Sequence, residues 1–541
     1  MYLLIIIFIF VAKMFIQRIH KKTKTKTYTS VVLMENYREG GKVKHRIVSN
    51  LSRWPDNLIS DFQKLLSGEK INSLSDLQFT QGKSMGAIAA IVEIAGRLGI
   101  KQALGNSKQA SLALFQIAGR IITQGSRNYL ANEWAKGQEI EKTLNLIDFN
   151  EDSLYDNLDW LTVNQDEIER KIFNFRSKDK AIKEVFLYDV TSSYFEGDQN
   201  ELAEYGYNRD KKKGKKQIVI GLLTDKEGYP LSVEVFKGNT GDTQTVSNQL
   251  QKLKNNFGVD RVVFVGDKGM IKSAQIAEIT SQEYLWNYLT TITKQQIQTL
   301  LEEDIIQLEL FDNDVIEVNG EGDVRYILRR NPIRAIEIRA NRMSKIGAVK
   351  TLVATQNSYL QAHKKATTPI ALKKIQDKIS KLKLNKIITA TSNGRIIRMV
   401  VNTIAKKEEE KLDGCYVVKT NVPKESAGTQ LIHDRYKDLA KVEFAFRTIK
   451  TTIEEIRPIY VRKEARTRGH VMVAMLAYMI VKYITEELST LNYTRKFVIE
   501  SLDKINYLEY EFEGQIIHVL PQNLLPHQNE IVEMLKLKLK T

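Results

Sequence analysis

Two short apolar runs, far apart in the chain, each lead into an aspartate, and this repeated pattern constrains the fold more than any other feature. Val185 to Tyr188 predicts a strand buried on both faces, and Asp189 lies at or just beyond its end. Val262 to Val265 repeats the pattern, and Asp267 follows it after a glycine. A buried carboxylate needs a hydrogen bond, an ion pair or a metal ion, because an unpaired one costs several kcal/mol.

Taken singly, either aspartate is typical of a turn or a helix cap. If the two strands are neighbours in one sheet, however, Asp189 and Asp267 lie side by side where the strands end. Two like charges so close raise one pKa unless a cation lies between them. The recurrence of the pattern therefore predicts an α/β sheet with a metal site.

The net charge of +16 over 541 residues favours nucleic acid as the partner, because a basic surface attracts phosphate backbones. The length predicts about two to four structural units. A hydrophobic fraction of 43% with 8 prolines excludes a largely disordered chain. Cys415 has no cysteine partner for a disulfide, and scattered histidines argue against a structural zinc site, so we expect a cytoplasmic protein.

Residues 1–13 are an apolar N-terminal extension that ends at Lys13. Its positive charges follow the apolar run instead of preceding it, which excludes an ordinary secretory signal. The run is also shorter than the roughly 20 residues that span a bilayer. Two interpretations stay open, a membrane anchor or an extension with no role in the fold and Met14 as the effective start. We favour the second and expect no membrane partner.

Changes of pattern divide the rest of the chain into five regions. Residues 14–74 predict an N-terminal β-hairpin region, and 75–180 carry apolar residues at helical spacing. The helical region is either a DNA-binding domain with a helix-turn-helix or a scaffold that does not touch DNA. The α/β core is predicted in two parts, 181–295 and 431–541 with its C-terminal helices, separated by a large mixed β/helical insertion at 296–430.

A third carboxylate, Glu443, lies on a predicted helix whose apolar residues recur every three or four positions. Arg447 and Lys450 fall with Glu443 on an adjoining face. Either Glu443 and Arg447 form an ordinary i,i+4 pair, or Glu443 completes the metal site while Arg447 and Lys450 hold DNA phosphates. A lysine-rich loop is likewise either a solvated hairpin tip or a clamp on a phosphate backbone. Its lysines are Lys211, Lys212, Lys213, Lys215 and Lys216.

These motifs, in this order, resemble the DDE transposases of bacterial insertion sequences, in the group marked by a Tyr-x2-Arg-x3-Glu-x6-Lys helix. Tyr436, Glu443 and Lys450 match that spacing, whereas Leu439 stands where the group often has arginine. The segments YDVTSSYFE, GYPLSVEVFKGNTGDT and VVFVGDKGM also look like this family. The resemblance covers nearly the whole chain from Met14.

The resemblance implies an RNase H-like catalytic core. In such a core Asp189, Asp267 and Glu443 are the catalytic residues and bind two Mg²⁺ ions, or Mn²⁺ in their place. Tyr436, Arg447 and Lys450 are then expected to contact DNA. Tyr416 lies where some relatives stack an aromatic ring on an extruded base, although an ordinary strand aromatic is the simpler interpretation.

The implied activity is transposition. The protein is expected to bind the terminal inverted repeats of its element in double-stranded DNA, to nick the DNA and to join the freed 3′-OH to target DNA. Because two ends must be brought together, we expect a homodimer in a synaptic complex, associated with the bacterial nucleoid. Two alternatives stay open: an inactive protein that only binds the repeats, and an RNase H-like nuclease that cuts without joining.

Overall fold

The computed structural model describes residues 14–22, 27–40, 42–69, 79–178, 184–195, 197, 199–210, 212, 214–312, 314–451, 461–512, 515–519 and 524–539. The chain divides into two compact units. The smaller joins Met1–Gly82 with Tyr507–Pro521, and the larger comprises Lys83–Asn506 and Gln522–Thr541. The apolar extension, residues 1–13, lies outside the described residues.

The smaller unit contains an antiparallel sheet in the order β1-β2-β3. Its elements are β1 (Met14–Lys22), β2 (Thr27–Glu39), β3 (Lys42–Asn50) and a helix, α2 (Asp56–Ser67). The predicted hairpin is confirmed as β2 and β3, and β1 is a strand that the sequence did not predict. Ile59 of α2 packs with Ile16, Val31 and Leu33 of the sheet, which gives this unit a small core of its own.

A second small sheet has three strands in the order β16-β15-β4. It consists of β4 (Phe79–Ser84), β15 (Asn506–Phe512) and β16 (Gln515–Val519). The N-terminal part of the chain therefore pairs with a strand more than four hundred residues later. A sequence pattern does not predict a pairing between segments so far apart.

Helices make up the region after β4, as predicted. They are α3 (Gly86–Arg97), α4 (Ile100–Leu104), α5 (Lys108–Ile122), α6 (Arg127–Asn132), α7 (Ile140–Leu144), α8 (Glu151–Val163) and α9 (Gln165–Arg176). The side chain of Ser107 caps α5, whose residues are buried along most of its length against α8 and α18 (Glu464–Glu487). A helix so covered offers no face to a DNA groove, so α5 is not a recognition helix.

The long apolar helix α18 lies in the interior of the larger unit, with most of its residues buried. It is one of the C-terminal helices that the sequence predicts for the second part of the core. Over the residues that the structure describes, no helix has both the length and the apolar character needed to cross a membrane.

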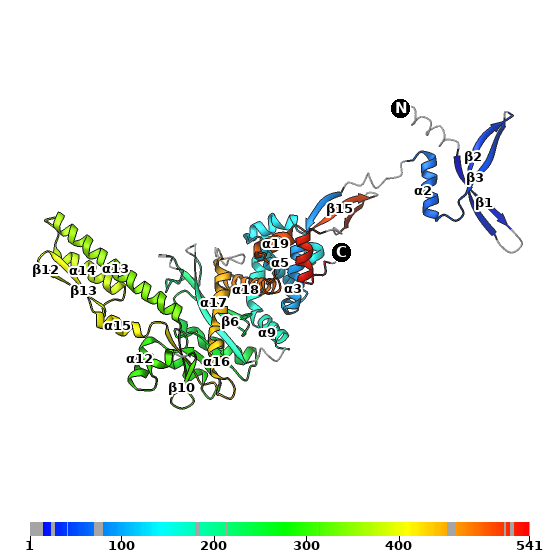
Figure 1. Ribbon diagram of the computed structural model, residues 1–541. Helices are drawn as coiled ribbons and strands as arrows, with labels where there is room; N and C mark the ends of the chain where they lie inside the picture. The colour runs from blue at the N-terminus through cyan, green and yellow to red at the C-terminus, as the bar shows by residue number, and fades with distance from the viewer. Residues whose placement is uncertain are drawn as a thin grey trace. The chain divides into compact units, whose positions relative to one another are not determined.

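The large sheet has eight strands in the order β10-β11-β14-β9-β8-β5-β6-β7. Their bounds are β5 (Val185–Tyr194), β6 (Gln217–Thr224), β7 (Pro230–Lys237), β8 (Val263–Val265), β9 (Asn287–Thr291), β10 (Ile316–Asn319), β11 (Arg325–Arg330) and β14 (Cys415–Thr420). β5, β6 and β7 are antiparallel, while β8 and β9 run parallel to β5. Strands from the predicted insertion thus extend the core sheet (Figure 1).

Helices cover both faces of this sheet. One core joins Phe186 and Tyr188 of β5 to Leu250 and Ile279, on α10 (Val246–Gln251) and α11 (Ser273–Ile279). The other face of β5 is covered by α17 (Leu439–Thr451). Side chains alternate along a strand, and Phe186, Tyr188 and Val190 point into the first core. Leu187 and Asp189 therefore face α17.

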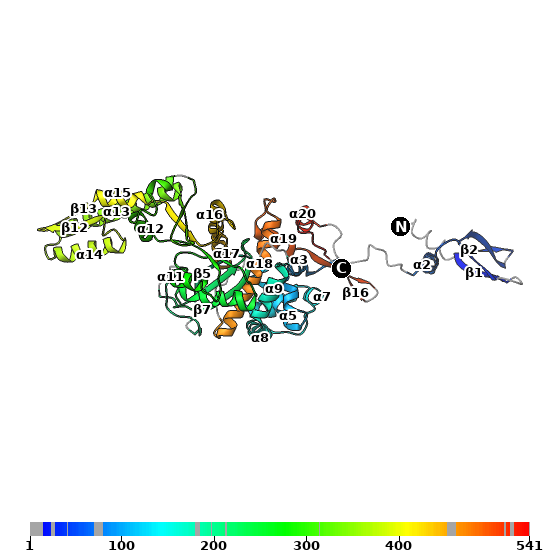
Figure 2. The same ribbon diagram turned by 90° about the horizontal axis from the view of Figure 1, so that it is seen from below.

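The middle of the insertion, residues 332–402, forms a separate layer around its own hydrophobic core. We call this segment the arm. The arm consists of α13 (Pro332–Ala362), α14 (Thr368–Lys381), β12 (Ile388–Asn393) and β13 (Ile396–Val401). The arm is thus a helical hairpin and an antiparallel strand pair, in keeping with the mixed β/helical insertion that the sequence predicts. Figures 1 and 2 show the four elements side by side, extending away from the large sheet within the larger unit.

The remaining helices connect these parts. They are α12 (Lys294–Glu302), α15 (Thr403–Lys411), α16 (Thr429–Lys437), α19 (Arg495–Asp503) and α20 (Pro526–Met534). α16 leads directly into α17 and contacts β9 and β11, so the chain returns from the insertion beside the strands of the core sheet.

Candidate active site

The two strands that lead into aspartates are neighbours. β5 and β8 pair in parallel, with Leu187 opposite Val265. Asp189 and Asp267 each lie two residues further along, so strand register brings them to the same level. The structure therefore meets the condition on which the sequence argument depended.

Asp189 does not lie at the end of its strand, as the sequence predicted, but in the middle of β5, opposite Leu222 of β6. The reason is that β5 goes on pairing with β6 as far as Tyr194, whereas its neighbour on the other edge, β8, already ends at Val265. Beyond this point one edge of β5 loses its neighbour. Asp189 is thus paired on one side and open on the other.

Burial raises the pKa of Asp189 to about 7, and the charges of Asp267 and Glu443 add to the shift. A hydrogen bond from the Val190 N–H to Oδ1, at 2.8 Å, and the charge of Arg209 oppose it. The three predicted carboxylates are therefore close enough to influence one another. Such mutual repulsion is what a bound cation relieves.

Asp267 belongs to the loop that leaves β8. Its Oδ1 accepts hydrogen bonds from the backbone N–H of Gly269 at 2.9 Å and of Met270 at 3.0 Å. Asp267 is thus a turn residue, the ordinary interpretation of its sequence context, and a member of the carboxylate group as well. The second oxygen, Oδ2, takes no part in these turn bonds.

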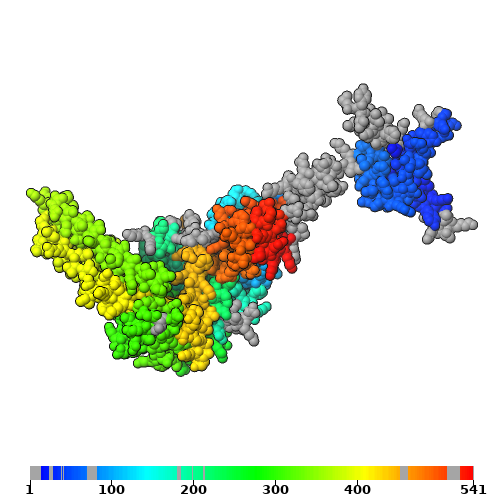
Figure 3. Space-filling view, in the orientation of Figure 1, coloured from blue at the N-terminus to red at the C-terminus, as the bar shows by residue number. Residues whose placement is uncertain are grey.

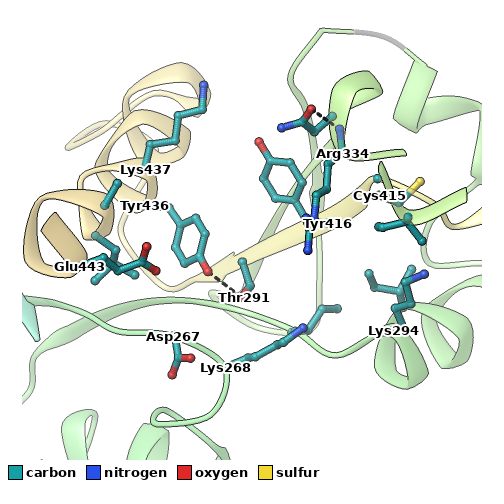
Figure 4. A pocket seen from close by; sticks show the side chains of 17 residues that line it. Asp267, Lys268, Thr291, Lys294, Arg334, Cys415, Tyr416, Tyr436, Lys437 and Glu443 are labelled. Atoms are coloured by element: carbon teal, nitrogen blue, oxygen red, sulfur yellow. Dashed lines mark hydrogen bonds between the residues drawn. The ribbon is translucent and has the colours of Figure 1, made fainter. Parts of the chain in front are cut away.

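Glu443 projects from α17, which packs on β5. The predicted buried stripe is present, since Val442, Phe446 and Ile449 are buried, whereas Glu443 is exposed. Figure 4 shows its carboxylate on the wall of a cavity, above Asp267. Over the part of the chain that the structure describes, no three His, Cys, Asp or Glu lie close enough to hold a metal ion as they stand.

A cavity of about 580 Å³ opens beside the carboxylates, between the core sheet and the start of α13. Asp267 and Glu443 line it, and Asp189 does not. Four cations that the sequence argument did not single out also line it: Lys268, Lys294, Arg334 and Lys437. The cavity therefore combines carboxylates with a positive wall, which suits a phosphate-bearing chain.

Two tyrosines predicted to contact DNA face each other across this cavity (Figure 4). The hydroxyl of Tyr436 shares a hydrogen bond of 2.9 Å with Thr291 Oγ1, and that of Tyr416 shares one of 2.6 Å with His433 Nε2. Burial raises the pKa of both hydroxyls. Both rings are held in place by neighbours, and their contact with DNA stays a prediction.

Arg447 and Lys450 do not share one exposed face. Arg447 is exposed, with its guanidinium 5.2 Å from the centre of the Phe444 ring. Lys450 is buried, and its Nζ donates to Asp210 Oδ1 at 3.1 Å and to the carbonyl oxygen of Ser192. The helical spacing did not reveal this burial, because Asp210 comes from a distant loop.

The lysine-rich loop lies between β5 and β6. Lys212 is exposed, with its Nζ 5.6 Å from the centre of the Tyr194 ring at the end of β5. Lys215 is also exposed, and Lys216 is half-buried, 6.0 Å from the Tyr205 ring. Two further lysines of the predicted clamp lie outside the described residues: Lys211 and Lys213.

Comparison with known families identifies two segments. Residues 16–75 match the family described as the IS1634 family transposase, N-terminal domain, and residues 180–480 match the transposase DDE domain. No curated protein sequence matches the chain. A solved structure, the piggyBac transposase synaptic complex with hairpin DNA, covers 77% of this chain and 76% of its own at 9% identity and a TM-score of 0.34, a similarity too low to carry an argument. The DDE domain spans more than half of the chain, which therefore belongs to the DDE transposases of insertion sequences.

Proposed function

We propose that this transposase binds the terminal inverted repeats of its insertion sequence as a homodimer, nicks the DNA and joins the free 3′-OH to target DNA. The observation that carries the proposal is that Asp189 lies in β5 and Asp267 in the loop that leaves the adjacent parallel strand β8, while Glu443 projects from α17, which packs on β5. We assign the core to the RNase H-like class. β5 and β8 are the first and fourth strands of the large sheet along the chain, so Asp189 lies in the first strand and Asp267 directly after the fourth.

The donor set fits divalent magnesium. Mg²⁺ prefers carboxylate oxygens and keeps several waters, so three carboxylates suffice if water and substrate phosphate complete the shell. The raised pKa of Asp189 supports the assignment: burial is its main cause, the charges of Asp267 and Glu443 add to it, and a divalent cation among the three carboxylates would favour the ionised form. Asp189, Asp267 and Glu443 would hold the ions, and Asp267 would use the oxygen that its turn leaves over.

When bound, two Mg²⁺ ions, or Mn²⁺ in their place, would activate the attacking water or 3′-hydroxyl and offset the charge on the leaving oxygen. The chain's own residues position the DNA. Lys268 and Lys437 hold phosphates beside the carboxylates, and Tyr416 offers its ring to a base. Further contacts to the DNA are assigned to Lys211, Lys212, Lys213, Lys215, Lys216, Tyr436, Arg447 and Lys450.

In this scheme Lys450 also has a positioning role, because it holds the helix that carries Glu443. Its buried ammonium ties α17 to Asp210 and to the backbone of β5, and this fixes the helix that carries Glu443 against the strand that carries Asp189. A phosphate contact by Lys450 requires that ion pair to open.

The joining step gives the sharpest test. A duplex carrying a precut element end with a free 3′-OH is incubated with Mg²⁺, the protein and a target plasmid, and joined products are sequenced. A matched duplex whose end lacks the 3′-hydroxyl serves as the control. We expect joined products with the first duplex and none with the second.

The two alternatives give different results in the same experiment. A nuclease without strand transfer cuts uncut element ends but yields no joined product from the precut end. An inactive DNA-binding protein shifts the element-end duplex in a gel and yields neither product. Either result, obtained with protein that binds the end duplex, would overturn the proposal.

A further inference from the structure

Most of the chain's net charge is concentrated in the arm. Residues 332–402 contain 15 Lys and Arg and only two acidic residues, Glu337 and Asp377, a formal charge of +13 out of +16 for the whole chain. The rest of the protein is therefore close to neutral. A basic surface confined to one element points to a partner that meets that element.

The arm folds around its own core and is anchored at its base. Ile375 and Ile379 of α14 pack with Val349 and Leu360 of α13. At the base, Arg342 donates to both oxygens of the buried Asp413 at 2.7 Å. The arm is therefore a built structure held to the sheet, and it is more than a charged loop (Figure 3).

Most of the arm's cations face solvent, and Arg342 at its base is a buried exception. Lys374, Lys378 and Lys381 of α14 are spaced four and three apart on one side of the helix, where Lys374 and Lys381 are exposed and Lys378 is half-buried beside the buried stripe. Lys350 and Arg398 are exposed on α13 and β13. Within the described residues, none of these five forms an ion pair with a carboxylate. Fixed, uncompensated positive charge suits a polyanion.

The arm begins at the candidate active site. Asn331, Arg334 and Ile338, at the start of α13, line the cavity that Asp267 and Glu443 also line. α13 has 31 residues, so it runs about 46 Å from that point at 1.5 Å per residue. This is the length of roughly 14 base pairs of duplex DNA at 3.4 Å per pair.

We propose that the arm, residues 332–402, binds the phosphate backbone of duplex DNA without sequence preference, along the stretch that leads away from the three carboxylates. The inference rests on the proposed function for its choice of DNA as the polyanion. An anionic membrane surface would attract the same charge. DNA is favoured because the arm begins at the cavity that Asp267 and Glu443 line, and Arg334 of the arm is one of the cations on its wall.

The test compares three variants of the full chain. The neutralised variant is Lys374→Gln, Lys378→Gln, Lys381→Gln, and the charge-retaining variant has Arg at the same three positions. The matched control is Lys411→Gln, Lys424→Gln, Lys496→Gln, three exposed lysines that each lie within 4 Å of a carboxylate. Binding to a random-sequence duplex is measured by fluorescence anisotropy at several salt concentrations, and binding to vesicles with anionic lipid is measured beside it.

Three lost phosphate contacts should make the slope of log affinity against log salt shallower by about 2.7, since each contact contributes about 0.9. We expect this change in the neutralised variant on random and element-end DNA alike. The charge-retaining variant and the matched control should keep the slope of the wild type. Thermal unfolding should be similar in all four proteins, because Lys374 and Lys381 are exposed and both glutamine and arginine keep part of the aliphatic stem of the half-buried Lys378.

An unchanged slope in the neutralised variant overturns the proposal, and so does binding to vesicles without binding to random DNA. The result is separable from the test of the proposed function. Joined products together with an unchanged slope would overturn only the proposal that the arm binds DNA. A shallower slope without joined products would overturn only the chemistry.

Discussion

Asp189 is a carboxylate that the fold places among other negative charges and mostly away from water. Its pKa lies near 7 because burial disfavours the ionised form and Asp267 and Glu443 repel it. At neutral pH the metal-free protein therefore meets a cost that either a proton or a divalent cation removes. If Asp189 binds a metal ion as proposed, stability and metal binding are linked through this one residue.

The pH dependence of stability follows from the sign of that shift. The pKa of Asp189 is raised from 3.8 to about 7, so the folded state binds the proton more tightly than the unfolded state does. Below pH 3.8 both states are protonated and nothing is lost. Between pH 3.8 and about 7 the free energy of unfolding falls as the pH rises, by up to about 4 kcal/mol at full desolvation. Above about pH 7 this residue causes no further loss.

The substitution Asp189→Asn should remove that cost. In a chelator at pH 8 we expect a higher midpoint of thermal unfolding for the variant than for the wild type, and at pH 4 a much smaller difference. The exposed Asp377→Asn serves as the control and should change neither midpoint. Equal midpoints for Asp189→Asn and wild type at pH 8 would show that the carboxylate pays no such cost.

At the scale of elements, the arm depends on one buried ion pair. Asp413 is fully buried and accepts both bonds from Arg342, while Lys294 approaches to 3.5 Å. Removing one partner of a buried pair leaves an uncompensated charge. A surface pair costs far less to remove, because water replaces the lost partner.

We therefore expect Asp413→Ala to destabilise the larger unit by about 3 to 5 kcal/mol in chemical denaturation. Arg334→Ala, which removes the exposed pair with Glu337 on the same helix, should cost less than about 1 kcal/mol. Similar losses from both substitutions would mean that Asp413 does not anchor the arm.

Sequence patterns predicted the strands and helices that depend on residues near one another in the chain. The apolar runs before Asp189 and Asp267 predicted strands, and the spacing on α17 predicted its buried face, since periodicity reports burial directly. Lys268 and Lys437 stand beside residues that the sequence did single out. Lys294 and Arg334 could not be found in this way, because they begin two separate helices, α12 and α13, that only the assembled sheet brings to one cavity.

For the same reason the sequence misplaced two features. It put Asp189 at a strand end because the apolar run stops at Tyr188, whereas pairing with β6 extends β5 to Tyr194. It also grouped Lys450 with Glu443 and Arg447 on one face of the helix and did not reveal its burial, because its partner Asp210 lies 240 positions away. Register and long-range pairing are properties of the assembled sheet, and no periodicity carries them.

For the whole molecule, the central question is how one catalytic site per chain serves an element with two ends. The proposed answer is a homodimer that holds both ends in one synaptic complex. Light scattering of the protein mixed with element-end duplex should give the mass of two chains and two duplexes. Random duplex should not support that complex. A complex of one chain with one duplex, at concentrations that allow joining, would contradict the homodimer.

The most direct test of the central claim is nicking of a supercoiled plasmid that carries the element's ends, with Mg²⁺ present. The wild type is compared with Asp189→Asn, Asp267→Asn and Glu443→Gln, each of which removes a charge and keeps an oxygen acceptor. Asp267→Asn is the most telling, because its Oδ1 can still accept from Gly269 and Met270, so the turn is kept. We expect nicking by the wild type and loss of nicking in all three variants, with end binding retained. Nicking at the wild-type rate by any of the three would contradict the claim that these carboxylates form the catalytic site.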